Sequence, residues 1–329
     1  MSSSNQIIPV KLGSFDFLHY FWITMRPYLL FVSGITGIVG LSFAPPLSLF
    51  NSAVLFLTFF LSYGFGQALT DCFQIDTDAL SSPYRPLTQG AISRKNVLTV
   101  SLTGLLLIGI ILTAYALINL FLATAAIGGL ATYTYFKKRW WAGPFYNAWI
   151  VALLCLIAYV AGSGKLLIPA TTDFYLVLLA VFFGYANFVL SGYFKDITAD
   201  AKTGYNTLPV VYGLKISRFV SDSFALLTIV LCGTLLYLKY ASNTPVFSSP
   251  FALLIFISGS ITSLAAQIRL RQVRIESEAH RAISPVVHTY ILLLASIAIA
   301  QKPAWSVFIS LFYVGFIITM KFRPMKAQI

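Results

Sequence analysis

The sequence predicts an all-α fold, a polytopic membrane bundle of nine or ten transmembrane helices around a central cavity. Of its 329 residues, 58% are hydrophobic and 10% are charged, and the mean hydropathy is +0.83. A soluble domain carries about 25% charged residues, so this composition excludes one. The two other observations are a series of apolar stretches of membrane-crossing length and a one-sided distribution of basic residues.

The apolar stretches follow one another along the chain. They cover residues 27–44, 50–70, 97–117, 119–136, 146–164, 174–194, 218–238, 250–268, 286–300 and 304–320. The last two are short, so they form either two thin spans or one span and an interfacial helix. We therefore expect a single integral membrane domain that occupies residues 1–329.

The basic residues predict the orientation of the spans. With the N-terminus in the cytoplasm, only Lys165, Lys239 and Lys302 fall outside, and the other 19 of the 22 Lys and Arg residues fall inside. This excess is the positive-inside pattern. The net charge of +12 therefore reflects topology, and we expect no nucleic-acid partner. We expect a multi-pass protein of a bacterial inner membrane with its active-site loops in the cytoplasm.

A cluster of acidic residues ends the second apolar stretch. On a continuous helix at about 100° per residue, Gln67, Asp71, Gln74 and Asp78 fall within about 60° of one another, and Asp76 points away. Two carboxylates and two amide oxygens form a hard-oxygen set that suits Mg²⁺. A carboxylate at the bilayer centre costs about 2.5–3.5 kcal/mol on insertion scales. These acids must therefore lie at a wet rim or beside a cation.

A second acidic cluster ends the sixth apolar stretch. Asp196 and Asp200 are four residues apart, so on a helix they share one face. Together the two clusters hold five of the ten acidic residues in the chain. Ordinary solvated loop acids are the alternative, but the clustering and the shared faces argue against it.

The two acidic clusters also indicate an internal repeat. The fourth and eighth apolar stretches each end in a basic cluster on the same predicted side. The chain is therefore expected to contain two four-helix pseudo-repeats, about residues 20–140 and 146–275, followed by C-terminal helices over 286–320. Such halves would place both acidic clusters around one cavity, because binding sites often lie at repeat interfaces.

Two segments resemble motifs of the UbiA-type intramembrane prenyltransferase superfamily. Residues 70–93, TDCFQIDTDALSSPYRPLTQGAIS, resemble its first motif, NDxxDxxxDxxxxPxRPxxSGxIS, and residues 196–213, DITADAKTGYNTLPVVYG, resemble its second, DxxxDxxxGxxTLPVxxG. Arg26, followed by Pro27, resembles an early Arg-Pro pair of the superfamily. Thr70 and Gln74 depart from the pattern, which usually has Asn and Asp at these positions.

The resemblance implies a Mg²⁺-dependent membrane enzyme. Such an enzyme ionises an isoprenyl diphosphate and transfers the prenyl group to an aromatic, quinone-precursor or lipid acceptor, releasing diphosphate. Two alternatives stay open: a terpene cyclase of the same superfamily that acts on the prenyl diphosphate alone, and an ion-coupled membrane transporter. Against the transporter, the acids lie at one rim and not near the midplane, where transporters bind their ions.

The resemblance and the residue patterns together define a candidate site. The expected catalytic residues are Asp71, Asp78, Asp196 and Asp200, and the expected Mg²⁺ ligands are these four and Gln74. The expected substrate-binding residues are Gln67, Arg85, Lys138, Asn147, Lys202 and Tyr133.

Three of these assignments depend on local sequence. Arg85 lies between two prolines, which break the helix and leave a loop that can close over the carboxylates; it is either a phosphate-binding residue or only a topology charge, and its place inside the matched motif favours the former. Asn147 is either a polar cavity group or a helix-start residue. Tyr133 either packs between helices or lines the cavity that faces a carbocation.

Overall fold

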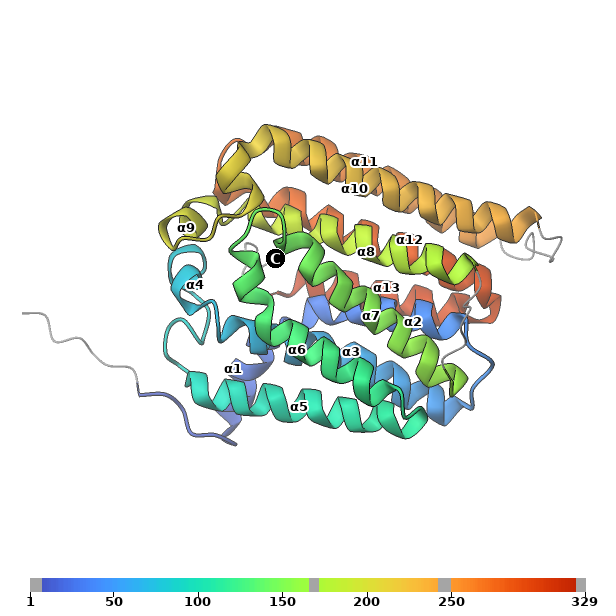
Figure 1. Cartoon of the computed structure of the whole chain (residues 1–329), viewed down its shortest axis with the longest axis horizontal. Coiled ribbons are helices and arrows are strands. Elements are labelled where there is room, and N and C mark those ends of the chain that lie inside the picture. Colours follow the sequence, from blue (N-terminus) through green and yellow to red (C-terminus); the bar gives the residue numbers. More distant parts are fainter. Residues whose placement is uncertain (1–7, 166–171, 242–249, 324–329) are drawn as a thin grey trace, which may run out of the picture.

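The computed structural model describes residues 8–165, 172–241 and 250–323, and it confirms the predicted all-helical membrane bundle (Figure 1). Among these described residues, eight helices are long and apolar enough to cross a membrane. A ninth span results if the N-terminal pair of helices, bent by 42°, is counted as one.

The helices are these, in chain order: α1 (Phe15–Met25), α2 (Leu30–Ser42), α3 (Leu49–Asp71), α4 (Ile75–Ser81), α5 (Arg94–Tyr115), α6 (Asn119–Lys137), α7 (Gly143–Ser163), α8 (Thr172–Tyr193), α9 (Ile197–Lys202), α10 (Leu208–Ala241), α11 (Pro250–Gln272), α12 (His280–Gln301) and α13 (Ser306–Lys321). Three 3₁₀ turns, η1 (Pro27–Leu29), η3 (Glu276–Glu278) and η4 (Pro303–Trp305), connect some of them.

Nine long helices form a closed ring. Helices α2, α3, α5, α6, α7, α8, α10, α11 and α12 each contact the next one, and α12 returns to contact α2. Contacts of α2 with α7 and of α8 with α12 cross the middle of the ring. Helix α13 packs against η1 and α12. The largest hydrophobic core lies where α2, α7, α8 and α12 meet, which holds the two halves of the ring together.

Each of the ten predicted spans coincides with a helix, but three differ in detail. Helix α6 covers 119–136 and is not among the helices apolar enough to span by composition, because its last turns contain Thr132, Tyr133, Thr134 and Tyr135. Helix α12 begins six residues before the predicted 286, so that span is not short. Helix α10 begins ten residues before the predicted 218 and is broken at Gly213, whose φ of 72° suits glycine.

Each acidic motif contains a short helix at one end of the bundle. Helices α4 and α9 follow α3 and α8, and they contact each other (Figure 1). The order of elements is therefore the same in both halves: a long helix, a long helix with a short one after it, and two more long helices. The division into pseudo-repeats agrees with this order and stays a prediction.

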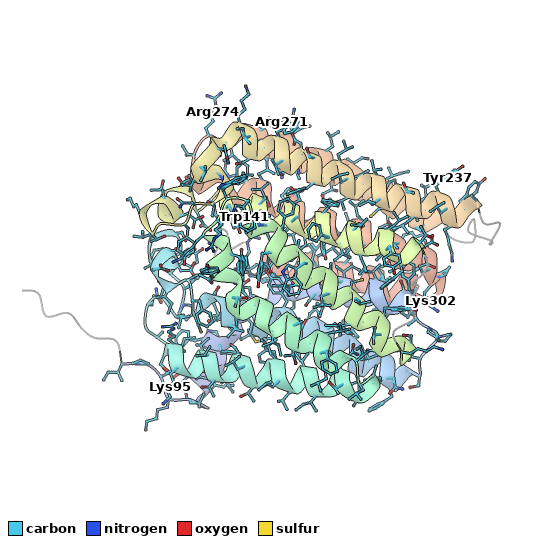
Figure 2. All side chains as sticks on the ribbon, in the orientation of Figure 1. Lys95, Trp141, Tyr237, Arg271, Arg274 and Lys302 are labelled. Atoms are coloured by element: carbon cyan, nitrogen blue, oxygen red, sulfur yellow. The ribbon has the colours of Figure 1, made fainter. Side chains whose placement is uncertain are left out.

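Charged residues separate between the two ends of the bundle. Lys95, Arg271 and Arg274 lie at the end that carries α4 and α9, and Lys302 lies at the opposite end (Figure 2). This is the separation that the positive-inside pattern predicts. Lys326, another predicted inside charge, lies outside the described residues.

Candidate active site

Helices α3 and α8 end in the same way just before their acidic motifs. After Asp71, the amides of Cys72, Phe73 and Gln74 each bond to the carbonyl three residues earlier, so the helix tightens into a 3₁₀ turn. The backbone then starts again as α4. The prediction of one continuous helix through Asp78 is therefore wrong. No proline or glycine marks the break.

The second motif repeats this geometry. The amides of Phe194, Lys195 and Asp196 bond three residues back, and α9 starts at the next residue. Gln74 and Asp196 are the N-cap residues of the two short helices, with φ and ψ of −124° and 19° in one and −115° and 9° in the other. Asp78 and Asp200 each lie four residues after their cap, so the two motifs correspond position by position.

A polar cavity lies between these motifs. Its charged lining residues are three carboxylates, Asp71, Asp78 and Asp196, and four cations, Arg26, Arg85, Lys137 and Lys195. Gln67, Gln74, Tyr133 and Asn147 also line it. The break after Asp71 is compatible with this arrangement, because the tight turn still brings Gln74 and Asp78 to the same cavity.

Two arginines hold the carboxylates of the first motif. Nη2 of Arg26 donates to both carboxylate oxygens of Asp71 at 3.0 Å, and Nε2 of Gln67 donates to one of them at 2.6 Å. Nη1 of Arg85 lies 2.5 Å from Asp78 and 3.9 Å from Asp71. The proline-flanked loop thus does close over both carboxylates.

The backbone at Arg26 is strained. Its φ of 53° is the one positive φ at a non-glycine residue among the described residues. Such a conformation costs of order 1–3 kcal/mol and persists where the surroundings impose it, often at functional sites. Here it turns the chain between α1 and η1, which directs the guanidinium toward Asp71.

Lys137 connects the two motifs. Its ammonium donates to Oε1 of Gln74 at 3.0 Å and lies 3.5 Å from Asp200. It also lies 5.5 and 5.1 Å from the ring centroids of Tyr193 and Tyr205, distances at which an aromatic face attracts a cation. The two short helices are therefore linked through one buried positive charge.

The two acids of the second motif have different surroundings. Asp196 lines the cavity, whereas Asp200 is fully buried behind it and accepts a hydrogen bond from Thr207 at 3.2 Å. Burial, opposed by Lys137, raises the pKa of Asp200 to about 6. Burial also lowers the pKa of Lys195 to about 8. Asp200 therefore does not lie among the cavity-lining residues that the sequence led us to expect.

Two predicted phosphate-binding lysines do not line the cavity. Lys138 is exposed, and its ammonium lies 4.6 Å from the centroid of the Tyr205 ring. Lys202 is exposed at the end of α9. On α6 the cavity side belongs to the neighbouring residue, Lys137, and the phosphate-binding role of Lys138 and Lys202 stays a prediction. A four-residue step from Tyr133 along one helical face points to Lys137 and could have identified it.

The cavity contains three cations that the sequence analysis did not assign to the site: Arg26, Lys137 and Lys195. Arg26 had a signal in the Arg-Pro pair, but its contact with a residue 45 positions later is not visible in the sequence. Lys195 directly precedes Asp196, and the tight turn there places both in the cavity.

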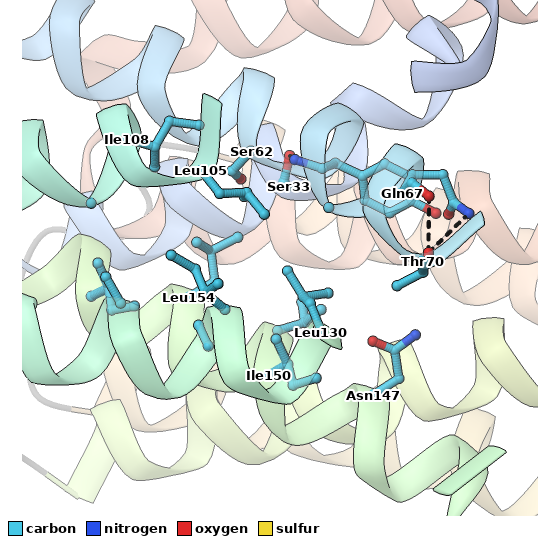
Figure 3. A pocket seen from close by; sticks show the side chains of 18 of the residues that line it. Ser33, Ser62, Gln67, Thr70, Leu105, Ile108, Leu130, Asn147, Ile150 and Leu154 are labelled. Carbon is cyan, nitrogen blue, oxygen red and sulfur yellow. Dashed lines mark hydrogen bonds between the residues drawn. The ribbon is translucent and has the colours of Figure 1, made fainter. Parts of the chain in front are cut away.

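An apolar cavity adjoins the polar one. Both cavities are lined by Tyr63, Gln67, Thr70, Asn147 and Tyr185. Figure 3 shows Gln67, Thr70 and Asn147 at one end of the apolar cavity and Ile108 and Leu154 toward the other. A polar head and an apolar chain can therefore bind as one molecule across the two cavities.

The fold and the site together define a membrane-embedded helical protein with a charged cavity that continues into an apolar one. The model of the UbiA prenyltransferase family matches residues 30–281. The chain belongs to this family, and it is a transferase of prenyl groups.

Curated relatives and solved structures agree with this membership. The chain is 30% identical over 213 residues to a digeranylgeranylglyceryl phosphate synthase of Thermococcus sibiricus, covering 63% of this chain and 73% of the relative. It is 31% identical over 214 residues to one of Methanococcus aeolicus, covering 64% and 70%.

Two solved structures share the fold. A UbiA homologue from Archaeoglobus fulgidus bound to GPP and Mg²⁺ has a TM-score of 0.64 and 17% identity, with 86% of this chain and 99% of the other covered. The apo structure of a UbiA homologue from Aeropyrum pernix K1 has a TM-score of 0.66 and 16% identity, with 88% and 98% covered.

Proposed function

We propose that this protein ionises an isoprenyl diphosphate at the polar cavity and transfers the prenyl group to a lipid acceptor. The observation that carries the proposal is the junction of the two cavities. The polar one offers four cations to a diphosphate, and the apolar one offers a dry channel to the prenyl tail. The shared residues Gln67 and Asn147 mark where the two parts of the donor would meet.

The cations are suited to a leaving diphosphate. Nε of Arg26 and Nε of Arg85 are buried and have no hydrogen-bond acceptor among the described residues. A buried donor without a partner costs roughly 1–3 kcal/mol, and phosphate oxygens at the cavity would satisfy both. Lys137 and Lys195 add two ammonium groups to the same cavity. Charged donors placed in this way stabilise the charge that develops on the leaving group.

The carboxylates fit Mg²⁺ that arrives with the substrate. Among the described residues, no three Asp, Glu, His or Cys side chains are arranged to hold a metal ion by themselves. Mg²⁺ is usually bound by one or two carboxylates together with substrate phosphates and water. Asp71, Asp78 and Asp196 offer such carboxylates. When bound, the metal would supply Lewis-acid stabilisation of the diphosphate. The Archaeoglobus fulgidus homologue with GPP and Mg²⁺ supports this assignment.

The proposed reaction breaks the bond between C1 of the prenyl chain and its bridging oxygen. The electron pair leaves with the diphosphate, and the carbocation lies at the apolar cavity, where water is excluded. A hydroxyl oxygen of the acceptor then bonds to C1, and its proton passes to the released diphosphate. Tyr133, whose hydroxyl lies 3.0 Å from that of Tyr193, lines the polar cavity, and in this proposal its ring faces the cation.

The acceptor class is proposed from the relatives. The relatives from Thermococcus sibiricus and Methanococcus aeolicus are named digeranylgeranylglyceryl phosphate synthases. A glycerol-based lipid acceptor can reach a membrane-embedded enzyme from the bilayer. The proposal also places the site at the cytoplasmic rim, as the basic residues indicate. The expected bacterial inner membrane stays a prediction, since these relatives are archaeal.

The test is diphosphate release by purified protein in detergent. Protein, a prenyl diphosphate and Mg²⁺ would be incubated with and without glycerol-lipid, aromatic or quinone-precursor acceptors, and products identified by mass. Release that requires the lipid and yields an adduct supports the proposal. Release without any acceptor, with a cyclic hydrocarbon product, indicates a cyclase. No release with any donor, or full turnover in excess chelator, contradicts the proposed function.

A further inference from the structure

A separate pocket lies between the end of α11, the start of α12 and Arg323, which follows α13. It shares no lining residue with the polar or the apolar cavity of the candidate site. Arg271 and Arg274, at and just after the end of α11, lie at the end of the bundle that carries α4 and α9 (Figure 2). The pocket is therefore at the same end of the bundle as the candidate site.

This pocket is strongly basic. Arg269 of α11, Arg281 of α12 and Arg323 line it from three different segments, and Glu278 is the one acid in its lining. Glu278 lies 4.0 Å from Arg281, so one carboxylate faces three guanidinium groups. The side chain of Arg269 has no hydrogen bond or ion pair among the described residues. Arginines that only set topology need not converge on one pocket, whereas a guanidinium group matches a phosphate group in shape and charge.

Large apolar side chains next to two of these arginines place the pocket at the membrane surface. Ile268 directly precedes Arg269, and Phe322 directly precedes Arg323; both apolar side chains are exposed. In a membrane protein such side chains lie against acyl chains, and a neighbouring arginine reaches toward the polar head groups. Basic pockets between membrane helices bind the phosphate groups of lipids in this way.

Helix α12 adds to the positive charge of the pocket. Its first two residues, His280 and Arg281, line the pocket, and its N-cap residue, Ala279, provides no side-chain hydrogen bond. The first amides of a helix carry a partial positive charge. They would therefore reinforce the attraction of the arginines for an anion.

The 3₁₀ turn η3 joins this pocket to the second acidic motif. Oε1 of Glu276 accepts hydrogen bonds from the amide of Thr198 at 3.0 Å and from its hydroxyl at 2.5 Å. Thr198 is the second residue of α9, and Glu278, at the other end of η3, lines the pocket. A ligand that orders η3 from the pocket side would therefore also hold the start of α9.

We propose that this pocket binds the phosphate group of an anionic lipid, and that its occupation steadies the second acidic motif through η3. The proposal goes beyond the proposed function and does not rest on it, because it concerns a different pocket and is tested by binding.

The first test measures binding to purified protein in a neutral detergent. The ligands are phosphatidylglycerol, a diacylglycerol with the same acyl chains, and inorganic phosphate. Arg269→Gln combined with Arg281→Gln should weaken phosphatidylglycerol binding by about tenfold or more, because two of the three guanidinium groups are lost. Arg274→Gln is the matched control, since Arg274 is exposed and does not line the pocket. It should weaken binding by less than about threefold, because solvent and salt screen an exposed charge.

The variants assign the site, because the polar cavity also contains cations. Equal losses in the double variant and in Arg274→Gln would overturn the proposal, as would diacylglycerol binding as tight as that of phosphatidylglycerol. Inorganic phosphate that binds as tightly as the lipid, with the same loss in the double variant, would support the site and identify phosphate from solution as its ligand. The Tm without lipid should be the same for all variants. If the double variant does not fold, Arg269→Gln alone replaces it.

The second test measures amide hydrogen exchange of the whole protein with and without phosphatidylglycerol. The lipid should slow exchange in residues 276–282 and in α9. Glu276→Ala should keep the first effect and lose the second, because it removes the acceptor that holds Thr198. If the lipid still slows exchange in α9 of this variant, η3 does not connect the pocket with the motif. Unchanged exchange in residues 276–282 of the native protein would overturn the proposed binding.

Discussion

The two acidic motifs share a backbone and differ in what their side chains do. In both, a long helix ends in a three-residue tight turn, a capping residue follows, and an aspartate lies four residues beyond the cap. In the first motif the cap is Gln74, and Asp78 lines the cavity beside Arg85. In the second the cap is Asp196, which lines the cavity, and Asp200 is buried behind it.

Two acids four residues apart on a short helix therefore need not have the same role. The second motif presents its capping carboxylate to the cavity and uses the later one to hold Lys137, which in turn contacts the amide of Gln74. The first motif has no capping carboxylate, and Asp71, before the turn, supplies its second negative charge. The two halves are therefore complementary.

The largest effect is expected from the first motif. Asp71→Asn should lower kcat by about a hundredfold or more, because it removes a carboxylate from the diphosphate and metal site. It should also lower Tm, because Arg26 then stays buried with no counter-charge, a change that typically costs about 3–5 kcal/mol. Diphosphate release and thermal unfolding in detergent measure the two effects.

The control for Asp71 is Asp173→Asn, which removes an acid in the first turn of α8, away from the motifs. It should leave both quantities unchanged. A fall in rate of less than tenfold for Asp71→Asn would contradict a role for this carboxylate in the reaction.

The second motif should separate into two effects. Asp196→Asn should raise the Mg²⁺ concentration needed for half-maximal rate and lower kcat, since its carboxylate lines the cavity. Asp200→Asn should leave the Mg²⁺ midpoint unchanged, because this side chain is buried behind the cavity and does not line it. Mg²⁺ titration and Tm measured on both variants decide the matter. If the two variants have the same Mg²⁺ midpoint, the proposed division of roles is wrong.

The pH dependence of stability sharpens this division. Burial raises the pKa of Asp200 from 3.8 to about 6, so between these values the folded protein binds a proton that the unfolded chain does not. This group therefore stabilises the fold most below pH 4, and its contribution is lost as pH rises through 6. The Tm of the native protein relative to Asp200→Asn should increase from pH 7 to pH 5. A difference in Tm between the two proteins that does not change with pH would contradict the raised pKa of Asp200.

Much of the fold followed from the sequence because a membrane imposes length and polarity on each span. Apolar runs located every long helix, and the two acidic clusters located the rim where the site lies. The break after Asp71 could not be read, because DCFQID contains no residue that forbids a helix. The last residue before the break, Asp71, is held by Arg26, a residue 45 positions earlier in the chain.

The choice between adjacent lysines shows a second limit. Composition and motif spacing place Lys137 and Lys138 equally near the site, and the distinction depends on which face α6 turns inward. A four-residue step from Tyr133 points to Lys137, but the sequence alone leaves open whether Tyr133 faces the cavity or packs between helices. Pairs that are distant in the chain, such as Lys137 and Asp200, depend on how the halves pack, and sequence patterns do not encode this directly.

A smaller effect is expected when the capping residues of the two motifs are made alike. Gln74→Asp restores the acid usual in the family at a position where the amide now accepts a hydrogen bond from Lys137. If Gln74 ligates Mg²⁺, the variant should lower the Mg²⁺ midpoint and leave the product unchanged. An unchanged midpoint together with a higher Tm would show that the new carboxylate pairs with Lys137 and that Gln74 is no ligand.

The smallest effect is expected from the contacts that join the two short helices outside the cavity. The hydroxyl of Tyr205, a buried residue after α9, donates to Asp76 of α4 at 3.2 Å, and the hydroxyls of Thr77 and Thr203 lie 2.9 Å apart. Asp76 is exposed and does not line the cavity. Its role is therefore to hold α4 against α9, which fixes the separation of the two motifs.

Tyr205→Phe and Asp76→Ala should each cost about 0.5–1.5 kcal/mol, as one hydrogen bond does, and lower kcat by less than about tenfold. If both single variants lose stability through this one hydrogen bond, the double variant should be about as stable as the less stable single variant. Thermal unfolding of the four proteins and their rates of diphosphate release measure this coupling. A loss of activity at Asp76 as large as that at Asp71 would mean that α4 turns its other face to the substrate during the reaction, and the correspondence between the two motifs would then fail.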